Sequence, residues 1–210
     1  VEGGVTPVFY GSCKFISNLL RQGIFTPGIF FDEVQFHYRK YLEKYEGQML
    51  NGDAVITTLG KLGEMSIPSG KFFLRDEGDS KELTGSVWTK AQFDAFLEKL
   101  NYSGDERALS LEVVYAPRKV IEKEWRLFVT DGRVSSGSQY MYFGELCSIR
   151  DVPESVVTFV EKLSERWSPS RVFVMDVGLV GDTLQVVEVN GFNSSGFYSA
   201  DVVRRTTSAE

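Results

Sequence analysis

The chain of 210 residues contains few of the groups that build disulfide, zinc or membrane-spanning structures. Its only cysteines, Cys13 and Cys147, lie far apart and lack the spacing of a metal site. That usage predicts a reducing compartment and no disulfide framework. The longest apolar runs are far shorter than the roughly 20 residues that cross a bilayer, and no signal-peptide pattern opens the chain. We therefore expect a cytoplasmic protein without a membrane segment.

Motifs of nucleophilic catalysis and of phosphate loops are also missing. The single histidine, His37, has no evident cysteine or serine partner, and the sequence contains no GxSxG. Triad-type catalysis is therefore not expected. No GxxxxGK[ST] phosphate loop occurs. The net charge is −6 and there is no dense run of lysine and arginine, which argues against non-specific binding to nucleic acid.

What is present is an ordinary globular composition, with 42% hydrophobic and 25% charged residues. The first third alternates short extended runs with helical periodicity, and from Ala108 three extended runs follow one another. The pattern predicts an α+β protein. We divide it into an α/β lobe at residues 1–70, a small lobe with a Gly/Ser/acid-rich loop at 71–110, and an antiparallel-sheet lobe at 111–210.

Local patterns predict several elements within these parts. Residues 6–10 have the composition of a short strand, and residues 34–45 have the apolar spacing of a helix. Thr89 is placed to cap an amphipathic helix, and a second helix is expected over residues 153–167 with proline at its start.

The stretch VFVMDVGLVGDTLQVVEVN at residues 172–190 is predicted to form a β-hairpin that turns at Gly181-Asp182. Asp176, Glu188 and Asn190 interrupt its apolar character. A buried carboxylate needs a partner, a proton or a metal ion. Glu188 and Asn190 share a strand face, and Asp176 joins them only if the loop holds an odd number of residues or a bulge corrects the register.

Together these three side chains offer oxygen ligands that suit Mg²⁺ carrying nucleotide phosphates. The plainer interpretation is that Asp176 and Asn190 are strand-end residues in contact with solvent. Since all three fall on neighbouring apolar strands, we favour a metal site.

A second polar group is predicted on the run IEKEWRLFVT, where Glu122, Glu124 and Arg126 face one way and the apolar residues the other. Glu124 and Arg126 form either a plain surface ion pair or a functional pair in which Arg126 holds a phosphoryl or carboxylate oxygen. Lys71 and Arg75 lie on a strand that leads into the loop at residues 76–86, and this loop carries Lys81.

These segments, in the order FFLRD…DSKELTG, EKEWRLFV, SSGSQY and VFVMDV…VVEVNGFNSSGFYSAD, resemble the ATP-grasp superfamily. More narrowly, the chain is similar to a compact clade of ATP-grasp domains found in bacteria and phages, from about Thr6 to Asp201. The resemblance implies a nucleotide held between two α+β lobes. It also implies ATP and Mg²⁺ as cofactors, and an acyl phosphate formed from a carboxylate and then attacked by an amine or similar nucleophile.

The resemblance further implies roles for individual residues. Asp176, Glu188 and Asn190 would bind one or two Mg²⁺ ions, and Arg126 would stabilise the transferred phosphoryl group while Glu124 orients it or a metal. The residues expected to contact ATP are Lys71, Arg75, Lys81, Glu112, Val113, Val114 and Tyr115. Of these, Lys81 lies on a loop that closes over the phosphates, and the backbone of residues 113–115 would read the adenine edge.

The expected activity is therefore that of an ATP- and Mg²⁺-dependent carboxylate–amine ligase acting on an amino acid, a peptide terminus or a protein side chain. Two alternatives stay open: a catalytically inactive nucleotide-binding or interaction module, and kinase-like phosphoryl transfer to a hydroxyl. We expect neither a nucleic-acid nor a membrane partner. The sequence leaves the oligomeric state and the identity of both substrates undefined.

Overall fold

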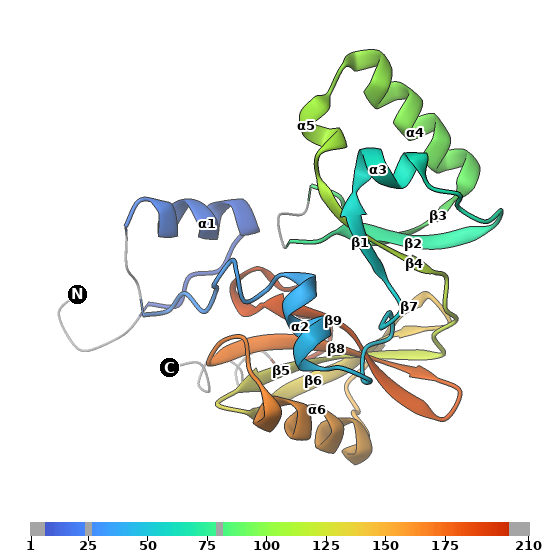
Figure 1. The fold of residues 1–210 in the computed structure, drawn as a ribbon. Coiled ribbons are helices and arrows are strands. Elements are labelled where there is room, and N and C mark those ends of the chain that lie inside the picture. The colour runs from blue at the N-terminus through green and yellow to red at the C-terminus, as the bar shows by residue number, and fades with distance from the viewer. Residues whose placement is uncertain (1–6, 24–26, 79–81, 202–210) are drawn as a thin grey trace. The chain divides into compact units, whose positions relative to one another are not determined.

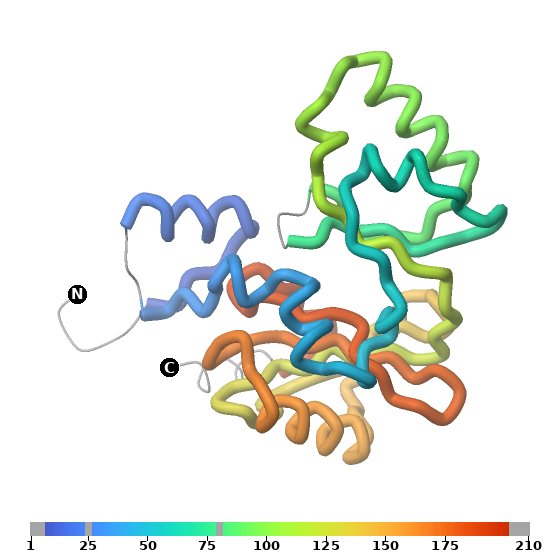
Figure 2. The backbone as a smooth tube through the Cα atoms, viewed as in Figure 1, coloured from blue at the N-terminus to red at the C-terminus, as the bar shows by residue number. Residues whose placement is uncertain are grey.

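The computed structural model describes residues 7–23, 27–78 and 82–201 (Figure 1). It confirms the predicted fold class, since helices accompany two antiparallel sheets. The chain forms two compact units, one made of residues 1–50 and 120–210 and the other of residues 51–119 (Figure 2). The second unit is thus inserted into the first. The three consecutive parts expected from the sequence stay a prediction.

The first unit is built on a five-stranded antiparallel sheet with the order β7-β6-β5-β8-β9. Its strands are β5 (Lys123–Thr130), β6 (Arg133–Tyr142), β7 (Glu145–Ile149), β8 (Val172–Val180) and β9 (Thr183–Gly191). The predicted hairpin is present as β8 and β9, and Gly181 adopts a positive φ at its turn. Helix α6 (Glu154–Arg166) lies against β5, β6 and β8 and buries the predicted apolar stripe of Val156, Val160 and Leu163 (Figure 1).

The amino-terminal part of this unit holds helices α1 (Cys13–Arg21) and α2 (Tyr38–Lys44). The strand expected at residues 6–10 is absent from the described residues 7–10, where only an isolated bridge joins Val8 to Gly28. The helix expected at 34–45 is shorter, because turns anchored on the Asp32 carboxylate occupy the residues before it. The 3₁₀ turn η1 (Phe192–Ser194) follows β9.

The second unit contains a four-stranded antiparallel sheet with the order β1-β4-β2-β3. Its strands are β1 (Val55–Thr58), β2 (Lys71–Asp76), β3 (Ser86–Thr89) and β4 (Glu112–Pro117), and its helices are α3 (Leu59–Glu64), α4 (Lys90–Ser103) and α5 (Glu106–Leu109). Thr89 caps α4 in a capping box with Gln92, as predicted. The extended run expected from Ala108 is wrong at its start, because the Asp105 side chain accepts from the Ala108 amide and caps the short helix α5.

The core of the second unit includes Phe72, Leu74 and Val113 from the sheet and Phe93 from α4. Among the described residues of either unit, no helix is both long and apolar enough to cross a membrane.

Candidate functional site

The register of the β8–β9 hairpin answers the question that the sequence left open. Val180 pairs with Thr183 across a two-residue turn, which alone would put Asp176 opposite Val187. A register shift between Asp176 and Val177 leaves Val187 as the extra residue, and Asp176 pairs with Glu188 instead. Residues directly opposite each other in an antiparallel pair share a face, so the two carboxylates lie on the same side of the sheet.

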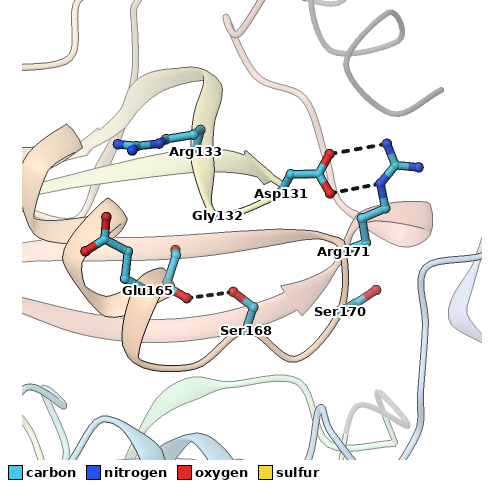
Figure 3. A pocket seen from close by; sticks show the side chains of 8 residues that line it. Asp131, Gly132, Arg133, Glu165, Ser168, Ser170 and Arg171 are labelled. Atoms are coloured by element: carbon cyan, nitrogen blue, oxygen red, sulfur yellow. Dashed lines mark hydrogen bonds and ion pairs between the residues drawn. The ribbon is translucent and has the colours of Figure 1, made fainter.

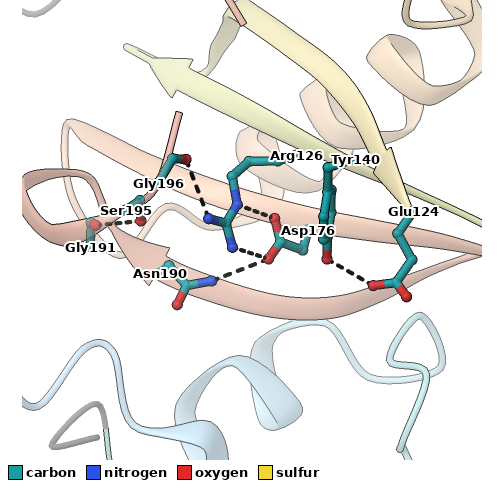
Figure 4. Close-up of polar contacts among 8 residues, drawn as sticks. All are labelled: Glu124, Arg126, Tyr140, Asp176, Asn190, Gly191, Ser195 and Gly196. Carbon is teal, nitrogen blue, oxygen red and sulfur yellow. Dashed lines mark hydrogen bonds and ion pairs between the residues drawn. The ribbon is translucent and has the colours of Figure 1, made fainter. Parts of the chain in front are cut away.

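Arg126 joins this face from the neighbouring strand, because β5 pairs with β8 in a register that sets Arg126 opposite Asp176. Its Nε donates to Asp176 Oδ1 at 2.8 Å and its Nη2 donates to Asp176 Oδ2 at 2.7 Å (Figure 4). The side chains are 12% and 2% exposed, so the pair is largely removed from solvent. Two parallel charge-assisted hydrogen bonds fix the guanidinium in one orientation.

This burial acts on the pKa of Arg126 in two opposing ways. Loss of hydration alone would lower it, since burial disfavours a charged group. The Coulombic attraction and hydrogen bonds of Asp176 outweigh that cost and raise the pKa above its ordinary value. Arg126 therefore stays a cation throughout the physiological range.

Glu124 points to the same face, two residues before Arg126, but its direct partner is a phenol. The Tyr140 hydroxyl donates to Glu124 Oε2 at 2.8 Å (Figure 4). Burial raises the pKa of Glu124, and the negative charges of Asp176 and Glu188 add to the rise, while the Tyr140 hydrogen bond and Arg126 oppose it. Burial also raises the pKa of Tyr140 well above its usual value, so its hydroxyl stays a donor.

Asp176, Glu188 and Asn190 offer the donor set expected for Mg²⁺, two carboxylates and an amide oxygen on neighbouring strands. The Asn190 Nδ2 donates to Asp176 Oδ2 at 3.4 Å, an arrangement in which the amide oxygen does not face that carboxylate (Figure 4). In the described chain, no group of three or more His, Cys, Asp or Glu side chains is arranged to hold a metal ion. A bound ion would therefore depend on the amide and on oxygens supplied by its ligand.

One buried hydroxyl on the same face supports a polar ligand there. Ser138 on β6 lies opposite Arg126 in register, and it is completely buried. Within the described chain its Oγ has no hydrogen-bond partner. A buried hydroxyl without a partner is costly, and such groups in native proteins are commonly satisfied by water or a ligand.

The segment after β9 completes the site from the side of the chain end. Gly196 O accepts from Arg126 Nη1 at 3.3 Å, and Ser195 Oγ donates to Gly191 O at 2.7 Å (Figure 4). The buried Asn193 amide donates to Phe9 O at 2.6 Å and Gly28 O at 2.9 Å, and its Oδ1 accepts from Phe30 N at 2.8 Å. Sequence reasoning did not single out Asn193, whose signal was only its place in the run NGFNSSG.

The residues predicted to contact phosphate belong to the second unit. Lys71 is exposed at the start of β2. Arg75 is 5% exposed near the end of β2, and its Nε donates to Asp76 O at 2.9 Å. Lys81 lies outside the described residues. The structure therefore gives Arg75 a fixed place on the strand, which is more than an ordinary surface residue would have.

Residues 112–115 form the first part of β4, which lies between β1 and β2. Val113, Val114 and Tyr115 are each paired with a residue on both neighbouring strands. Central-strand pairing engages the backbone groups of a residue in the ladder. The predicted reading of adenine by the backbone of 113–115 stays a prediction, and the residues after Tyr115, which pair with β2 alone, are the nearest ones with a free ladder edge.

A separate open cavity of about 630 Å³ lies at the turn between β5 and β6 and the end of α6 (Figure 3). Its two arginines are paired with carboxylates, Arg171 with Asp131 and Arg133 with Glu161. None of the residues predicted from the sequence lines it. We therefore do not assign the predicted chemistry to this cavity.

Two antiparallel sheets in a mixed α+β chain, with an arginine and two carboxylates in register on one of them, define an ATP-grasp protein. The chain belongs to an ATP-grasp domain family, the third family of its clade, whose model matches residues 22–209. No curated protein matches the chain.

Several solved ATP-grasp structures are similar to it in fold. The crystal structure of the D-cycloserine synthetase DcsG matches with 13% identity and a TM-score of 0.60, covering 99% of this chain and 86% of the other. The ATP-grasp ligase PsnB complexed with minimal precursor matches with 13% identity and a TM-score of 0.55, covering 84% and 59%. The D-alanine–D-alanine ligase from Bacillus anthracis complexed with ATP matches with 15% identity and a TM-score of 0.52, covering 84% and 62%.

These likenesses show the fold. In two further complexes of PsnB, one with a phosphomimetic variant of the minimal precursor and one with the precursor peptide PsnA2, this chain spans 50% and 52% of the ligase.

Proposed function

We propose that the protein is an ATP- and Mg²⁺-dependent carboxylate–amine ligase that works through an acyl phosphate. The observation that carries the proposal is the cross-strand row of Arg126, Asp176 and Glu188 on one face of the sheet. Family membership supports it, since ATP-grasp proteins are usually ATP-dependent ligases.

In the proposed reaction a substrate carboxylate oxygen attacks the γ-phosphorus of ATP, and ADP leaves. An amine then attacks the acyl carbon and phosphate leaves with the bonding electrons. Neither step needs a protein nucleophile, so positioning and charge stabilisation must supply the acceleration. Arg126, which stays positively charged, is suited to stabilise the phosphoryl oxygens.

The Asp176 and Glu188 carboxylates, with the Asn190 amide oxygen, would hold Mg²⁺, which supplies charge neutralisation between the phosphates. Glu124 would orient the phosphoryl group or the ion. From the second unit, Lys71, Arg75 and Lys81 would bind phosphate, and Glu112 with residues 113–115 would bind adenine.

We further propose that the substrate carboxylate belongs to an amino acid, a peptide or a protein. The proteins of similar fold carry names that point to such substrates: a D-alanine–D-alanine ligase, a D-cycloserine synthetase, and a ligase complexed with a precursor peptide. The small polar residues of SSGSQY at 135–140 and NSSGFY at 193–198 would line the acceptor site.

The proposal is tested first by thermal unfolding of the wild type and Glu188→Gln with ATP, in the presence and absence of Mg²⁺. At 100 times its Kd a ligand that binds only the native state adds about 2.7 kcal/mol of stability. For a chain of this size that corresponds to a rise in Tm of roughly 5–10 °C. We expect this rise only with Mg²⁺, and its loss in Glu188→Gln.

Glu145→Gln is the matched control, because it removes the same charge from the exposed strand β7. It should keep the full shift. If neither ATP nor ADP raises the Tm of the wild type, the ligase proposal fails and the chain is an interaction module. Once binding is shown, ADP release with amino acids and peptides, and trapping of the acyl phosphate by hydroxylamine, identify the substrate. ADP release that requires a hydroxyl acceptor and gives no amide would instead indicate a kinase.

A further inference from the structure

The Arg126 guanidinium has two kinds of partner, and a metal ion would compete for only one of them. Its hydrogen-bonding edge meets the Asp176 carboxylate. Its Cζ lies over two aromatic rings, 5.5 Å from the centroid of Tyr140 and 5.0 Å from the centroid of Tyr198. Both distances fall within the range of a cation–π interaction, which uses the face of the ring rather than an acceptor atom.

The two rings also contact each other. Their centroids are 4.7 Å apart and their planes differ by 19°. Tyr140 is 7% exposed and its hydroxyl is fixed by Glu124, so it forms the rigid member of the pair. Tyr198 is 48% exposed and reaches the pair from the segment after η1. An aromatic ring so exposed would gain little from burial alone, which calls for another reason for its position.

The backbone of Tyr198 supports a specific role for this ring. Its φ is +47°, in the left-handed region that a bulky residue seldom adopts. Such conformations persist where the surroundings hold them, and they gather at functional sites. Here Gly196 O accepts from Arg126 on one side, while on the other Ser199 contacts Ser148 and the Asp201 amide donates to Ser136 Oγ. The segment 196–201 is thus fastened at both ends with the Tyr198 ring between them.

The consequence concerns what happens to Arg126 when Asp176 serves another partner. A divalent ion recruits carboxylate oxygens and weakens their hold on a neighbouring guanidinium. The rings are not ligands for a hard cation, so their contact with Arg126 is unaffected. They also leave the N–H donors in the guanidinium plane available for phosphoryl oxygens.

We propose that Tyr198, stacked on Tyr140, is a positioning residue that keeps the Arg126 guanidinium in place when the Asp176 carboxylate is engaged elsewhere. The part of this proposal that concerns Mg²⁺ rests on the proposed function. The mechanical part does not, because it can be tested by weakening Asp176 through mutation.

The experiment is ¹⁵N relaxation of the Arg126 Nε–Hε group in the ligand-free full chain, with the signal assigned by its absence in Arg126→Lys. The proteins compared are the wild type, Y198F, Y198L, D176N and D176N/Y198L. Order parameters near about 0.85 mark a rigid group and values below about 0.6 a flexible one. We expect the wild type and Y198F to be rigid, D176N to stay above about 0.6, and D176N/Y198L to fall below it.

A merely structural role for Tyr198 would lower the Tm of Y198L without moving the Arg126 order parameter, so that result overturns the proposal. The proposal is equally overturned if D176N alone is already flexible, or if D176N/Y198L stays as rigid as D176N. Should the Asp176 variants fail to fold, exchange of the Arg126 Hε proton with water decides the question. It should be faster in Y198L than in Y198F, and equal rates would contradict the positioning role.

Addition of Mg²⁺ and ADP separates this inference from the proposed function. In the wild type Arg126 should stay rigid, whereas in Y198L it should become mobile once the ligands bind. If the ligands change neither spectrum, the proposed function fails, while the D176N comparison still decides whether the rings hold Arg126.

Discussion

Glu124 and Arg126 lie two residues apart on one strand face, and burial affects their charges differently. Arg126 has a carboxylate in direct contact, which more than offsets the loss of hydration. Glu124 has a neutral phenol in direct contact, and two further carboxylates nearby make ionisation harder. The folded chain thus carries a stable cation beside a carboxylate that binds a proton more readily than usual.

This difference predicts a pH-dependent effect of Glu124→Gln. Because the pKa of Glu124 is raised in the folded chain, the wild type loses stability as pH rises from the ordinary value of 4.5 through the raised one. Glutamine cannot ionise, so the variant should be more stable than the wild type at neutral pH, with the gap closing below pH 4.5. Urea unfolding between pH 4 and 8 measures it.

The control is Glu145→Gln on the exposed strand β7. It should change stability little and without this pH profile. A gap that does not vary with pH, or a wild type that is more stable than Glu124→Gln at neutral pH, contradicts the assignment.

At this scale the sequence points to Asp176, Glu188 and Arg126 because each interrupts an apolar strand pattern. Whether Asp176 faces Glu188 depends on one extra residue, Val187, and hydrophobic alternation does not reveal which residue of an apolar run is unpaired. Tyr140 and Tyr198 could not be distinguished from core aromatics, since their contacts with Arg126 come from pairing between distant strands and from a positive φ.

At the scale of elements, the turn after β9 is joined to the amino-terminal segment by one side chain. Asn193 is fully buried and makes three hydrogen bonds with backbone groups of Phe9, Gly28 and Phe30. Tyr10 adds a hydrogen bond to Ser195 O at 2.8 Å and a stack on Phe197. The position of the segment that carries Gly196 and Tyr198 therefore depends on residues near the start of the chain.

We predict that Asn193→Ala destabilises the protein by about 3 kcal/mol, because buried backbone groups lose their partner. Ser194→Ala is the control, since Ser194 Oγ accepts only a weak bond from Cys13 Sγ at 3.2 Å. Its cost should stay below about 1 kcal/mol. Urea unfolding measures both, and similar costs for the two variants would contradict the role given to Asn193.

Elements with strong local signals could be predicted from the sequence. Thr89 begins α4 through its capping box, and the hairpin β8–β9 turns at Gly181. The misjudged elements are those governed by one non-local or capping contact. Val8 makes only a bridge because its partner Gly28 belongs to an irregular segment, and Asp105 converts the residues around Ala108 into a helical turn.

For the whole molecule, residues 51–119 form a unit inserted into the first one. Within the first unit, pairing around Val186 joins the chain just before the insertion to β9, with Leu50 N donating to Val186 O at 2.8 Å. Periodicity along a sequence reports local structure and carries no information about which distant segments pair. This is why the insertion could not be predicted.

If ATP contacts the residues assigned to it, hydrogen exchange of the intact chain should slow in both units when Mg²⁺ and ATP are added. At 100 times Kd, amides that exchange through global opening should slow by roughly 100-fold. We expect additional local protection in β8–β9 and at the end of β2 near Arg75. Glu188→Gln is the control and should show neither effect. Protection confined to residues 120–201 would exclude Arg75 and residues 112–115 from the ATP site.

The hydrogen bonds of Asn193 also bear on how the chain folds during synthesis. Its partners Phe30, Gly28 and Phe9 precede it by 163 to 184 residues. Contacts of such separation carry a large loop-closure cost and slow folding. A ribosome adding about 5–20 residues per second would expose the amino-terminal segment for roughly 8–40 s before Asn193 emerges. The acceptor side of the site is therefore the last part of the protein to assemble, and nascent chains that stop before η1 should need chaperones rather than retain partial activity.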